Sequence, residues 1–453
     1  MKEIRRQGAE GRYRGAGRGR RQLAGMCLAA VLAAFGVTAA AAEPAQKVTL
    51  ENGLRVILKP NLASQVVALE LLVKASAADE SPQAAGVRQL AQQLLLRGTR
   101  RRSGAEVGRA LELLGASLQV SVGLDYTEVY GLSSAAHFEE MLRLLAEVVT
   151  QPSFAAEELE KQRQLALEFL RSQRDDAFQA TYLAFREMLY DDSAYGRAAA
   201  GTEAGLKALT REQVVNLYES YYGPNNAVLA VSGNVDAPRA MKVIAQAFSG
   251  WRRAALPTEA RSPGSPAALT ESVVEVREGP VESAALILGF AAPAAGEQDF
   301  FALQVMESLL GGGMSSRLSR RLREEWGLAY EVTCFYPTLR GESHFAAYLL
   351  TDPARMAEAK DLVVAELERL RREPVPAAEL RRAKAFLLGS YALAHQRTKQ
   401  QAYYLAWYEL LGLGAEFDEE YPKGIEAVTA EQVQQAAQRH FQRYALALLL
   451  PDH

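Results

Sequence analysis

Residues 210–233 read TREQVVNLYESYYGPNNAVLAVSG, and residues 429–450 read TAEQVQQAAQRHFQRYALALLL. Each stretch begins with a helix-forming run and ends in a short apolar run that is typical of a buried strand. An earlier pair also matches, PSFAAEELEKQRQLALE at 152–168 and PVPAAELRRAKAFLL at 374–388. The copies are offset by 219 residues at Thr210 and Thr429, and by 221 at Glu158 and Glu379. Two matches in the same order at nearly the same offset predict a chain of two duplicated halves.

Each half has the same local plan. Strand-like segments come first, such as KVTLENGLRVILKP at 47–60, and helical runs follow. This order favours an α+β fold with helices on one face of a sheet. The Gly/Pro/Ser/Ala-rich stretch 252–271 reads as a linker. The predicted domains are therefore 43–251 and 272–453, and the helical runs that we expect are 83–97, 134–150, 155–174, 211–222, 377–395 and 430–441.

The composition is that of a globular protein. The 453 residues are 49% hydrophobic and 23% charged, with a formal charge of −3. Intrinsic disorder is excluded as the main state, and the charge gives no reason to expect a nucleic-acid partner. Two cysteines are too few for a disulfide scaffold or an all-cysteine zinc ribbon.

Residues 1–42 have the pattern of a secretory signal peptide. An arginine-rich start precedes the apolar run LAGMCLAAVLAAFGVTAAAA at 23–42, which ends in small residues. We expect cleavage after Ala42, export to a bacterial periplasm and no stable membrane anchor afterwards; an uncleaved anchor or mitochondrial import is the alternative. The mature chain would keep only Cys334, so it could form no intrachain disulfide.

Several motifs together resemble one enzyme family. They are GVRQLAQQLLLRGT at 86–99, NGLRVIL at 52–58, YYGPNNAVLAVSGNVD at 221–236 and LLGGGMSSRLSRRLREEWGLAY at 309–330. These stretches resemble the pitrilysin/insulinase metallopeptidases, the inverzincins. The resemblance implies two α+β domains, each a mainly antiparallel sheet with helices packed on one face, that form half of a clam-like chamber. In length, the chain is similar to the short, processing-peptidase-like bacterial branch of the family, whose subunits work in pairs.

The zinc motif of the family is degenerate here. Where the family has His-x-x-Glu-His, this chain has Gln89, Gln92 and Gln93. Amides are poor zinc ligands beside imidazole, and they cannot take a proton from water near neutral pH. The family's third ligand is a later Glu, and Glu168 stands in that place. We therefore expect no zinc in this chain. The five histidines have no metal-ligand spacing and read as isolated surface or core residues; they are His137, His344, His395, His440 and His453.

Other family features are retained. The resemblance gives Arg323 and Tyr330, in LREEWGLAY, the task of binding substrate carbonyls and stabilising the oxyanion opposite the zinc. A guanidinium fork and a phenol suit developing negative charge, although a solvated Arg and a core Tyr are the alternative. Gly311, Gly312 and Gly313 are not followed by Gly-Lys-Ser/Thr, which excludes a phosphate loop. They form either a loop that approaches substrate or partner, or a flexible turn.

The sequence thus predicts a non-catalytic subunit of a heterodimeric zinc metallopeptidase. It would supply Arg323 and Tyr330 to a homologous partner that carries His-x-x-Glu-His and the zinc, and the assembly would cleave peptides. One alternative is an inactive homologue that serves as a binding or assembly scaffold, like the core subunits of respiratory complexes that share this fold. A second alternative is a self-sufficient peptidase with an unusual metal site.

Overall fold

The computed structural model describes residues 44–191, 193–257 and 264–452. The predicted signal peptide therefore lies outside the described residues, as does the middle of the predicted linker. The described parts of that linker, 252–257 and 264–271, contain no helix or strand. Among the described residues, no helix is both long and apolar enough to cross a membrane.

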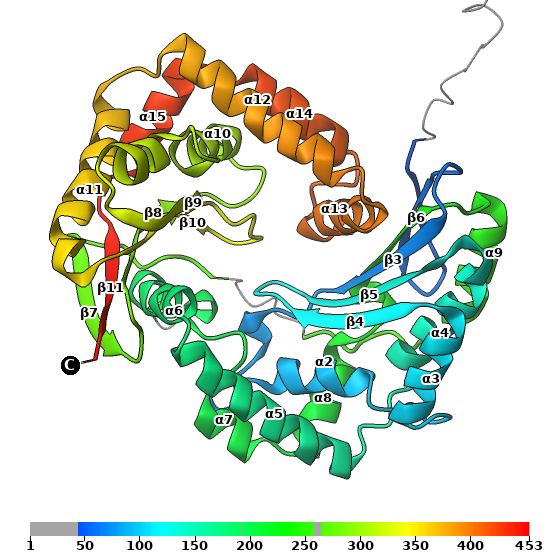
Figure 1. The fold of residues 1–453 in the computed structure, drawn as a ribbon. Coiled ribbons are helices and arrows are strands. Elements are labelled where there is room, and N and C mark those ends of the chain that lie inside the picture. Colours follow the sequence, from blue (N-terminus) through cyan, green and yellow to red (C-terminus); the bar gives the residue numbers. More distant parts are fainter. Residues whose placement is uncertain (1–43, 192, 258–263, 453) are drawn as a thin grey trace, which may run out of the picture. The chain divides into compact units, whose positions relative to one another are not determined.

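The N-terminal half contains a six-stranded sheet in the order β1-β2-β6-β3-β5-β4 (Figure 1). Only the β2–β6 pair is parallel. The C-terminal half contains a five-stranded sheet in the order β7-β11-β8-β10-β9, in which only β7–β11 is parallel. The strands are β1 (Gln46–Thr49), β2 (Arg55–Pro60), β3 (Val66–Val73), β4 (Ser117–Val122), β5 (Thr127–Ser134), β6 (Ala227–Gly233), β7 (Val273–Gly279), β8 (Ala284–Ala292), β9 (Ala329–Phe335), β10 (Ser343–Thr351) and β11 (Ala445–Pro451).

Apart from β1, the two sheets have the same topology. The last strand of each half, β6 or β11, lies beside the first long strand of the same half in a parallel pair. The helices that precede these last strands also begin in the same way, because Thr210 and Thr429 each form a capping box with the Gln three residues later. The predicted α+β class, the mainly antiparallel sheets and the repeated plan of the halves are confirmed.

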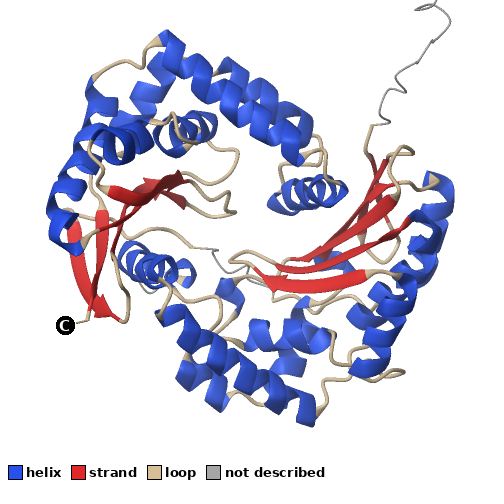
Figure 2. Ribbon diagram, in the orientation of Figure 1, coloured by secondary structure: helices blue, strands red, loops and turns tan. Residues whose placement is uncertain are grey.

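Helices cover one face of each sheet, as the sequence predicts (Figure 2). On the N-terminal sheet, Leu69 and Val231 share an apolar core with helices α2, α4, α8 and α9. On the C-terminal sheet, Leu288 and Phe345 pack with α10, α11 and α15. The helices of the two halves are α2 (Val87–Leu95), α3 (Gly104–Leu114), α4 (Phe138–Thr150), α5 (Ala156–Arg174), α6 (Ala177–Tyr190), α7 (Glu203–Ala208), α8 (Arg211–Tyr221), α9 (Ala237–Phe248), α10 (Phe300–Gly311), α11 (Met356–Arg372), α12 (Ala377–Ala394), α13 (Thr398–Leu411), α14 (Phe417–Ala427) and α15 (Ala430–His440). Shorter helical turns are η1 (Ala77–Asp79), η2 (Pro82–Ala84), η3 (Ala135–His137), η4 (Ala194–Gly196), η5 (Pro224–Asn226), η7 (Pro353–Arg355) and the π-helix η6 (Ser319–Glu325).

The second face of each sheet is covered by a helix from the other half. Helix α6 packs on β8 and β11, and α13 packs on β3 and β6. The ring of Phe185 on α6 lies so close to Gly289 of β8 that a Cβ there would be 2.6 Å from it. On the other sheet, the rings of Trp407 on α13 and Tyr126 are 4.7 Å apart. The sequence predicted helices on one face only. The inner strands β6 and β8 are buried on both faces, and the exchanged helices provide the second cover.

Candidate functional site

Helix α2 carries the three glutamines of the degenerate zinc motif, and its start is tightly fixed. Gly86 precedes it with φ at 104°, and a Cβ there would be 2.6 Å from the side chain of Leu206. Both facts favour glycine at this position. The glycine expected from the family motif therefore has a structural reason in this chain.

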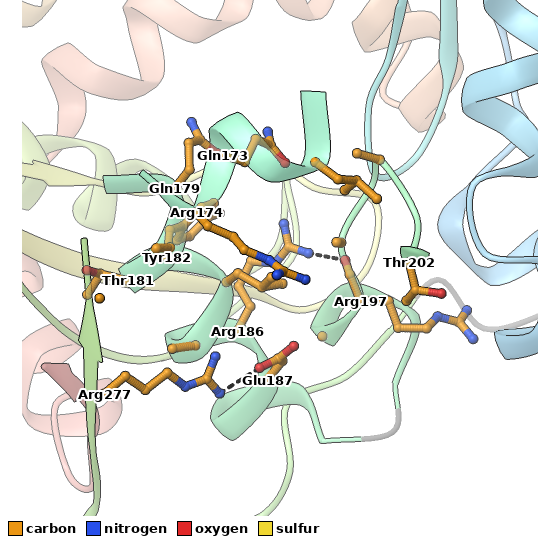
Figure 3. A pocket seen from close by; sticks show the side chains of 18 of the residues that line it. Gln173, Arg174, Gln179, Thr181, Tyr182, Arg186, Glu187, Arg197, Thr202 and Arg277 are labelled. Atoms are coloured by element: carbon orange, nitrogen blue, oxygen red, sulfur yellow. Dashed lines mark hydrogen bonds and ion pairs between the residues drawn. The ribbon is translucent and has the colours of Figure 1, made fainter. Parts of the chain in front are cut away.

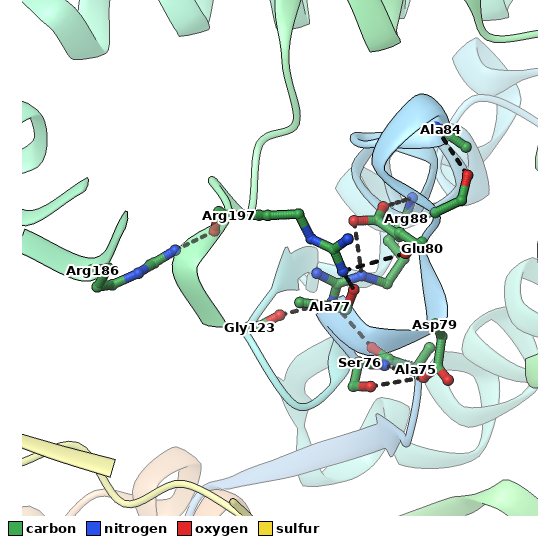
Figure 4. A network of polar contacts seen from close by, with 11 residues as sticks. Ala75, Ser76, Ala77, Asp79, Glu80, Ala84, Arg88, Gly123, Arg186 and Arg197 are labelled. Carbon is green, nitrogen blue, oxygen red and sulfur yellow. Dashed lines mark hydrogen bonds and ion pairs between the residues drawn. The ribbon is translucent and has the colours of Figure 1, made fainter. Parts of the chain in front are cut away.

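A buried arginine anchors the first turn of α2 (Figure 4). Arg88 has no exposed surface, and its Nη1 donates to the carbonyl oxygens of Ala75 and Gly123 at 3.1 and 2.8 Å. Its Nε lies 3.5 Å from Glu80 Oε2, and Glu80 Oε1 accepts from the backbone N–H of Arg88 at 2.7 Å. This buried ion pair fixes α2 against the segment that follows β3.

Gln92, which replaces the family's general base, is a buried structural residue. Its side chain has no exposed surface. The Oε1 atom accepts a hydrogen bond from the Tyr222 hydroxyl at 2.5 Å, and Nε2 donates to the carbonyl oxygen of Glu128. Burial raises the pKa of Tyr222, so this hydroxyl stays a donor. Both ends of the amide are therefore occupied by partners of this chain.

The other positions of the motif do not form a metal site. Gln89 and Gln93 are half-buried, and neither side chain makes a hydrogen bond to another described residue. Glu168 lies on α5, which packs against α2, but its side chain is exposed. In the described ranges, no group of three or more His, Cys, Asp and Glu residues could hold a metal ion. The expectation that this chain binds no zinc stays a prediction.

Three of the described histidines have partners within this chain. Burial lowers the pKa of His344 to about 3, and its two ring nitrogens lie 2.9 Å from the hydroxyls of Tyr182 and Tyr190. His395 pairs with Asp418 at 2.7 Å, and His440 pairs with Asp299 at 3.0 Å. His344 is thus a satisfied, neutral core residue, as its isolation in the sequence suggests.

Arg323 and Tyr330 are open to solvent. Arg323 lies in the π-helix η6, a type of segment that is frequent at functional sites. Tyr330 is 59% exposed and lies on β9, which is an edge strand of its sheet. Neither side chain has a hydrogen bond or an ion pair within the part of the chain that the structure describes. Two exposed apolar side chains of the same stretch, Met314 and Trp326, were not predicted from the sequence. The position of Trp326 directly after the charged run LREE was a visible sign that it is exposed.

The three glycines at the end of α10 have close contacts inside the chain. A Cβ on Gly311 would lie 2.1 Å from the backbone nitrogen of Cys334, so glycine lets α10 approach β9. Gly313 has φ at 82°, a conformation that favours glycine. These contacts explain Gly311 and Gly313 without a ligand. A role of the loop in binding substrate stays a prediction.

Comparisons with known families agree with this architecture. The model for Insulinase (Peptidase family M16) matches residues 55–203, and the model for the Peptidase M16 inactive domain matches residues 208–387. The chain belongs to peptidase family M16. The two matches together run from residue 55 to residue 387 and reach into both halves, so the inverzincin resemblance of the sequence is confirmed.

Individual family members match along most of their length. An uncharacterised zinc protease of Mycobacterium bovis is 29% identical over 420 residues, which are 91% of this chain and 94% of that protein. An uncharacterised zinc protease of Bacillus subtilis is 25% identical over 408 residues, 90% of this chain and 98% of that protein. Two solved structures share the fold: a protease from Helicobacter pylori, with a TM-score of 0.85 and 22% identity over 90% of this chain and all of that one, and a peptidase M16 inactive domain from Pseudomonas fluorescens, with a TM-score of 0.83 and 22% identity over 91% and 98%. With the three glutamines, these matches support an inactive peptidase homologue.

Proposed function

We propose that this M16 family member is the zinc-free subunit of a two-subunit peptidase, exported to the bacterial periplasm. The observation that carries the proposal is a contrast within one chain. Gln92 is buried, and both polar atoms of its amide are hydrogen-bonded, where the family needs a general base. Arg323 and Tyr330, in contrast, are exposed and have no partner among the described residues.

The proposed role of the open pair follows from its chemistry. A homologous subunit with His-x-x-Glu-His would hold zinc, which supplies a Lewis acid and an activated water. Arg323 would bind a peptide carbonyl through its guanidinium fork, and the Tyr330 hydroxyl would donate to the oxyanion. Tyr330 belongs to an edge strand, and a peptide that adds to a sheet edge binds through its backbone, so many sequences fit.

The test is reconstitution of the pair. The mature chain would be mixed with the homologous chain of the same organism that carries His-x-x-Glu-His, and cleavage of a fluorogenic peptide would be followed. We expect activity that needs both chains. Arg323→Ala or Tyr330→Phe should lower kcat by about 10²–10³-fold, the usual cost of one oxyanion donor. Because both side chains are exposed, each change should alter the free energy of unfolding by no more than about 0.5 kcal/mol.

Arg109→Ala is the matched control, because Arg109 is also exposed but lies on α3. It should leave the activity of the pair unchanged. If the pair is equally active with Arg323→Ala and Tyr330→Phe, the donated site is excluded and a binding or assembly role remains. Elemental analysis of the purified chain after dialysis gives the independent check. Far less than one zinc per chain is expected, and a stoichiometric zinc would contradict a zinc-free subunit.

A further inference from the structure

A cavity of about 700 Å³ lies between the C-terminal end of α5, helix α6, residues 196–203 and the end of β7 (Figure 3). Its lining includes no described residue of α2 or of η6. This volume is in the range of small-molecule sites. Apolar side chains make much of the wall: Leu170, Leu183, Ala198, Ala199, Pro280 and Leu448.

The wall formed by residues 196–203 is built tightly. Arg186 donates from Nε to the carbonyl oxygen of Tyr195 at 2.8 Å and from Nη2 to that of Arg197. Gly201 has φ at 90°, and a Cβ there would lie 2.5 Å from the carbonyl oxygen of Ala85. The small residues of this loop leave space in the cavity. The bonds from Arg186 and the close contact with Ala85 hold the loop backbone in place.

Arg186 is a buried cation that lines this cavity and has only neutral partners. Arg186 is only 7% exposed. Besides the two carbonyl groups, its guanidinium lies 5.3 Å from the centre of the Tyr182 ring. No carboxylate of the described residues is within ion-pair distance. A buried charge without a counter-ion is unfavourable, so an anion in the cavity would be stabilised.

A second guanidinium reaches the same space. In Figure 3 the side chains of Arg174 and Arg186 both extend into the pocket. The side chain of Arg174 is 72% exposed, and its nearest carboxylate, Glu203, is 4.0 Å away and lies closer to Lys207, at 2.7 Å. Arg277, in contrast, is paired with Glu187 at 2.7 Å. The charged residues that line the cavity balance: Arg174, Arg186, Arg197 and Arg277 stand against Glu187, Asp191, Glu203 and Glu278. A cavity without net charge suits one carboxylate beside the two guanidinium groups rather than a polyanion.

We propose that this cavity binds a carboxylate with an apolar body. The carboxylate accepts hydrogen bonds from Arg186 and Arg174, and the apolar body lies against Leu170, Leu183 and Leu448. The C-terminal end of an apolar peptide and a medium-chain fatty acid share this chemistry. The site is independent of the peptidase role, because none of its residues belongs to the degenerate zinc motif or to the Arg323–Tyr330 pair.

The test is calorimetric titration of the mature protein with acetyl-Leu-Leu-Phe, as the free acid and as the C-terminal amide, and with decanoate and decanol. Each acid should bind about tenfold more tightly than its neutral counterpart, because a charge-assisted bond is lost in the latter. Arg174→Ala should weaken binding of the acid about fivefold. Ala199→Trp, which fills the cavity from the loop, should abolish binding, and the Arg109→Ala control should bind as the wild type.

Binding of the tripeptide acid alone would assign a peptide end, and binding of decanoate alone would assign a fatty acid. Equal affinity for acid and neutral compound, or unchanged affinity in Ala199→Trp, would overturn the proposal. So would the absence of saturation by either acid. Arg174→Ala and Ala199→Trp change exposed or loop positions, and thermal unfolding in each case shows whether the fold is kept. Peptidase activity of the reconstituted pair is a separate readout, which these outcomes do not decide.

Discussion

Helix α2 and the segment from η6 to β9 use their polar side chains in opposite ways. On α2, Gln92 is buried and both of its amide atoms are bonded to the chain. In η6 and β9, the side chains of Arg323 and Tyr330 are exposed and form no hydrogen bond or ion pair with a described residue. The position that cannot act as a general base is part of the core, whereas the side chains suited to an oxyanion make no hydrogen bond or ion pair that would stabilise the described chain. A residue with no structural task in its own chain is a better candidate for contact with another molecule.

The largest effect on the α2 side of this comparison should come from Arg88. Its ion pair with Glu80 is buried, so Arg88→Ala leaves a carboxylate in the interior without its counter-ion. We expect a loss of about 3–5 kcal/mol in the free energy of unfolding, measured by urea denaturation. The double change Arg88→Met with Glu80→Gln removes both charges and should cost less. An equal or larger loss in the double variant would show that the broken ion pair does not cause the loss of stability in Arg88→Ala.

Restoring the family's carboxylate at position 92 tests whether the site has been rebuilt around an amide. In Gln92→Glu, a carboxylate oxygen would face the carbonyl oxygen of Glu128, which accepts a hydrogen bond in the present chain. The new acid would be protonated in the folded protein, so its pKa would lie above the unfolded value of about 4.3. The loss in the free energy of unfolding is therefore absent well below pH 4. It grows as the pH rises through the pKa of the acid in the unfolded chain, and it reaches about 2–3 kcal/mol at pH 7.

The matched control for this change is Gln93→Glu, on the same helix but half-buried and without a hydrogen-bond partner in the described chain. It should cost less than about 1 kcal/mol and depend little on pH. Thermal melts of both variants between pH 4 and 8 give the comparison. A pH-independent stability of Gln92→Glu would mean that the surroundings of position 92 accept a charge.

The smallest expected change in stability comes from a direct comparison of the two halves. Thr210 and Thr429 cap equivalent helices, with Gln213 and Gln432 completing the capping boxes. Thr→Ala at either position should destabilise the protein by about 1 kcal/mol. Similar losses of stability in urea denaturation would show that the two caps stabilise their helices equally. A loss at only one of them would show that the halves have diverged in this respect.

Much of the local structure could be predicted from the sequence. The expected helices at 155–174 and 377–395 are α5 (Ala156–Arg174) and α12 (Ala377–Ala394), within one residue at each end. Helix periodicity and flanking residues are local information, so a single sequence contains them. The helix expected at 83–97 is shorter, because Gly86 adopts a left-handed conformation and α2 begins only at Val87.

The candidate site could be predicted less completely. The replacement of two histidines and a glutamate is visible in the sequence, but the task of Gln92 is not, because its partner Tyr222 lies 130 residues away. The close approach of Gly311 to Cys334 is hidden for the same reason. The cavity beside Arg186 left no motif at all, since its wall is assembled from α5, α6, a loop and the C-terminal sheet.

By itself, the sequence determined the duplicated α+β plan, the order of helix and strand that ends each repeat, and the loss of the zinc motif. These follow from residue types and from spacing along one segment. Only the tertiary structure decided that α6 and α13 cover each other's sheets, that Gln92 is a core amide, and that Arg323 and Tyr330 are open. The reason is that burial depends on which distant segments pack together, and a free energy that is shared among residues far apart in the chain leaves no local pattern.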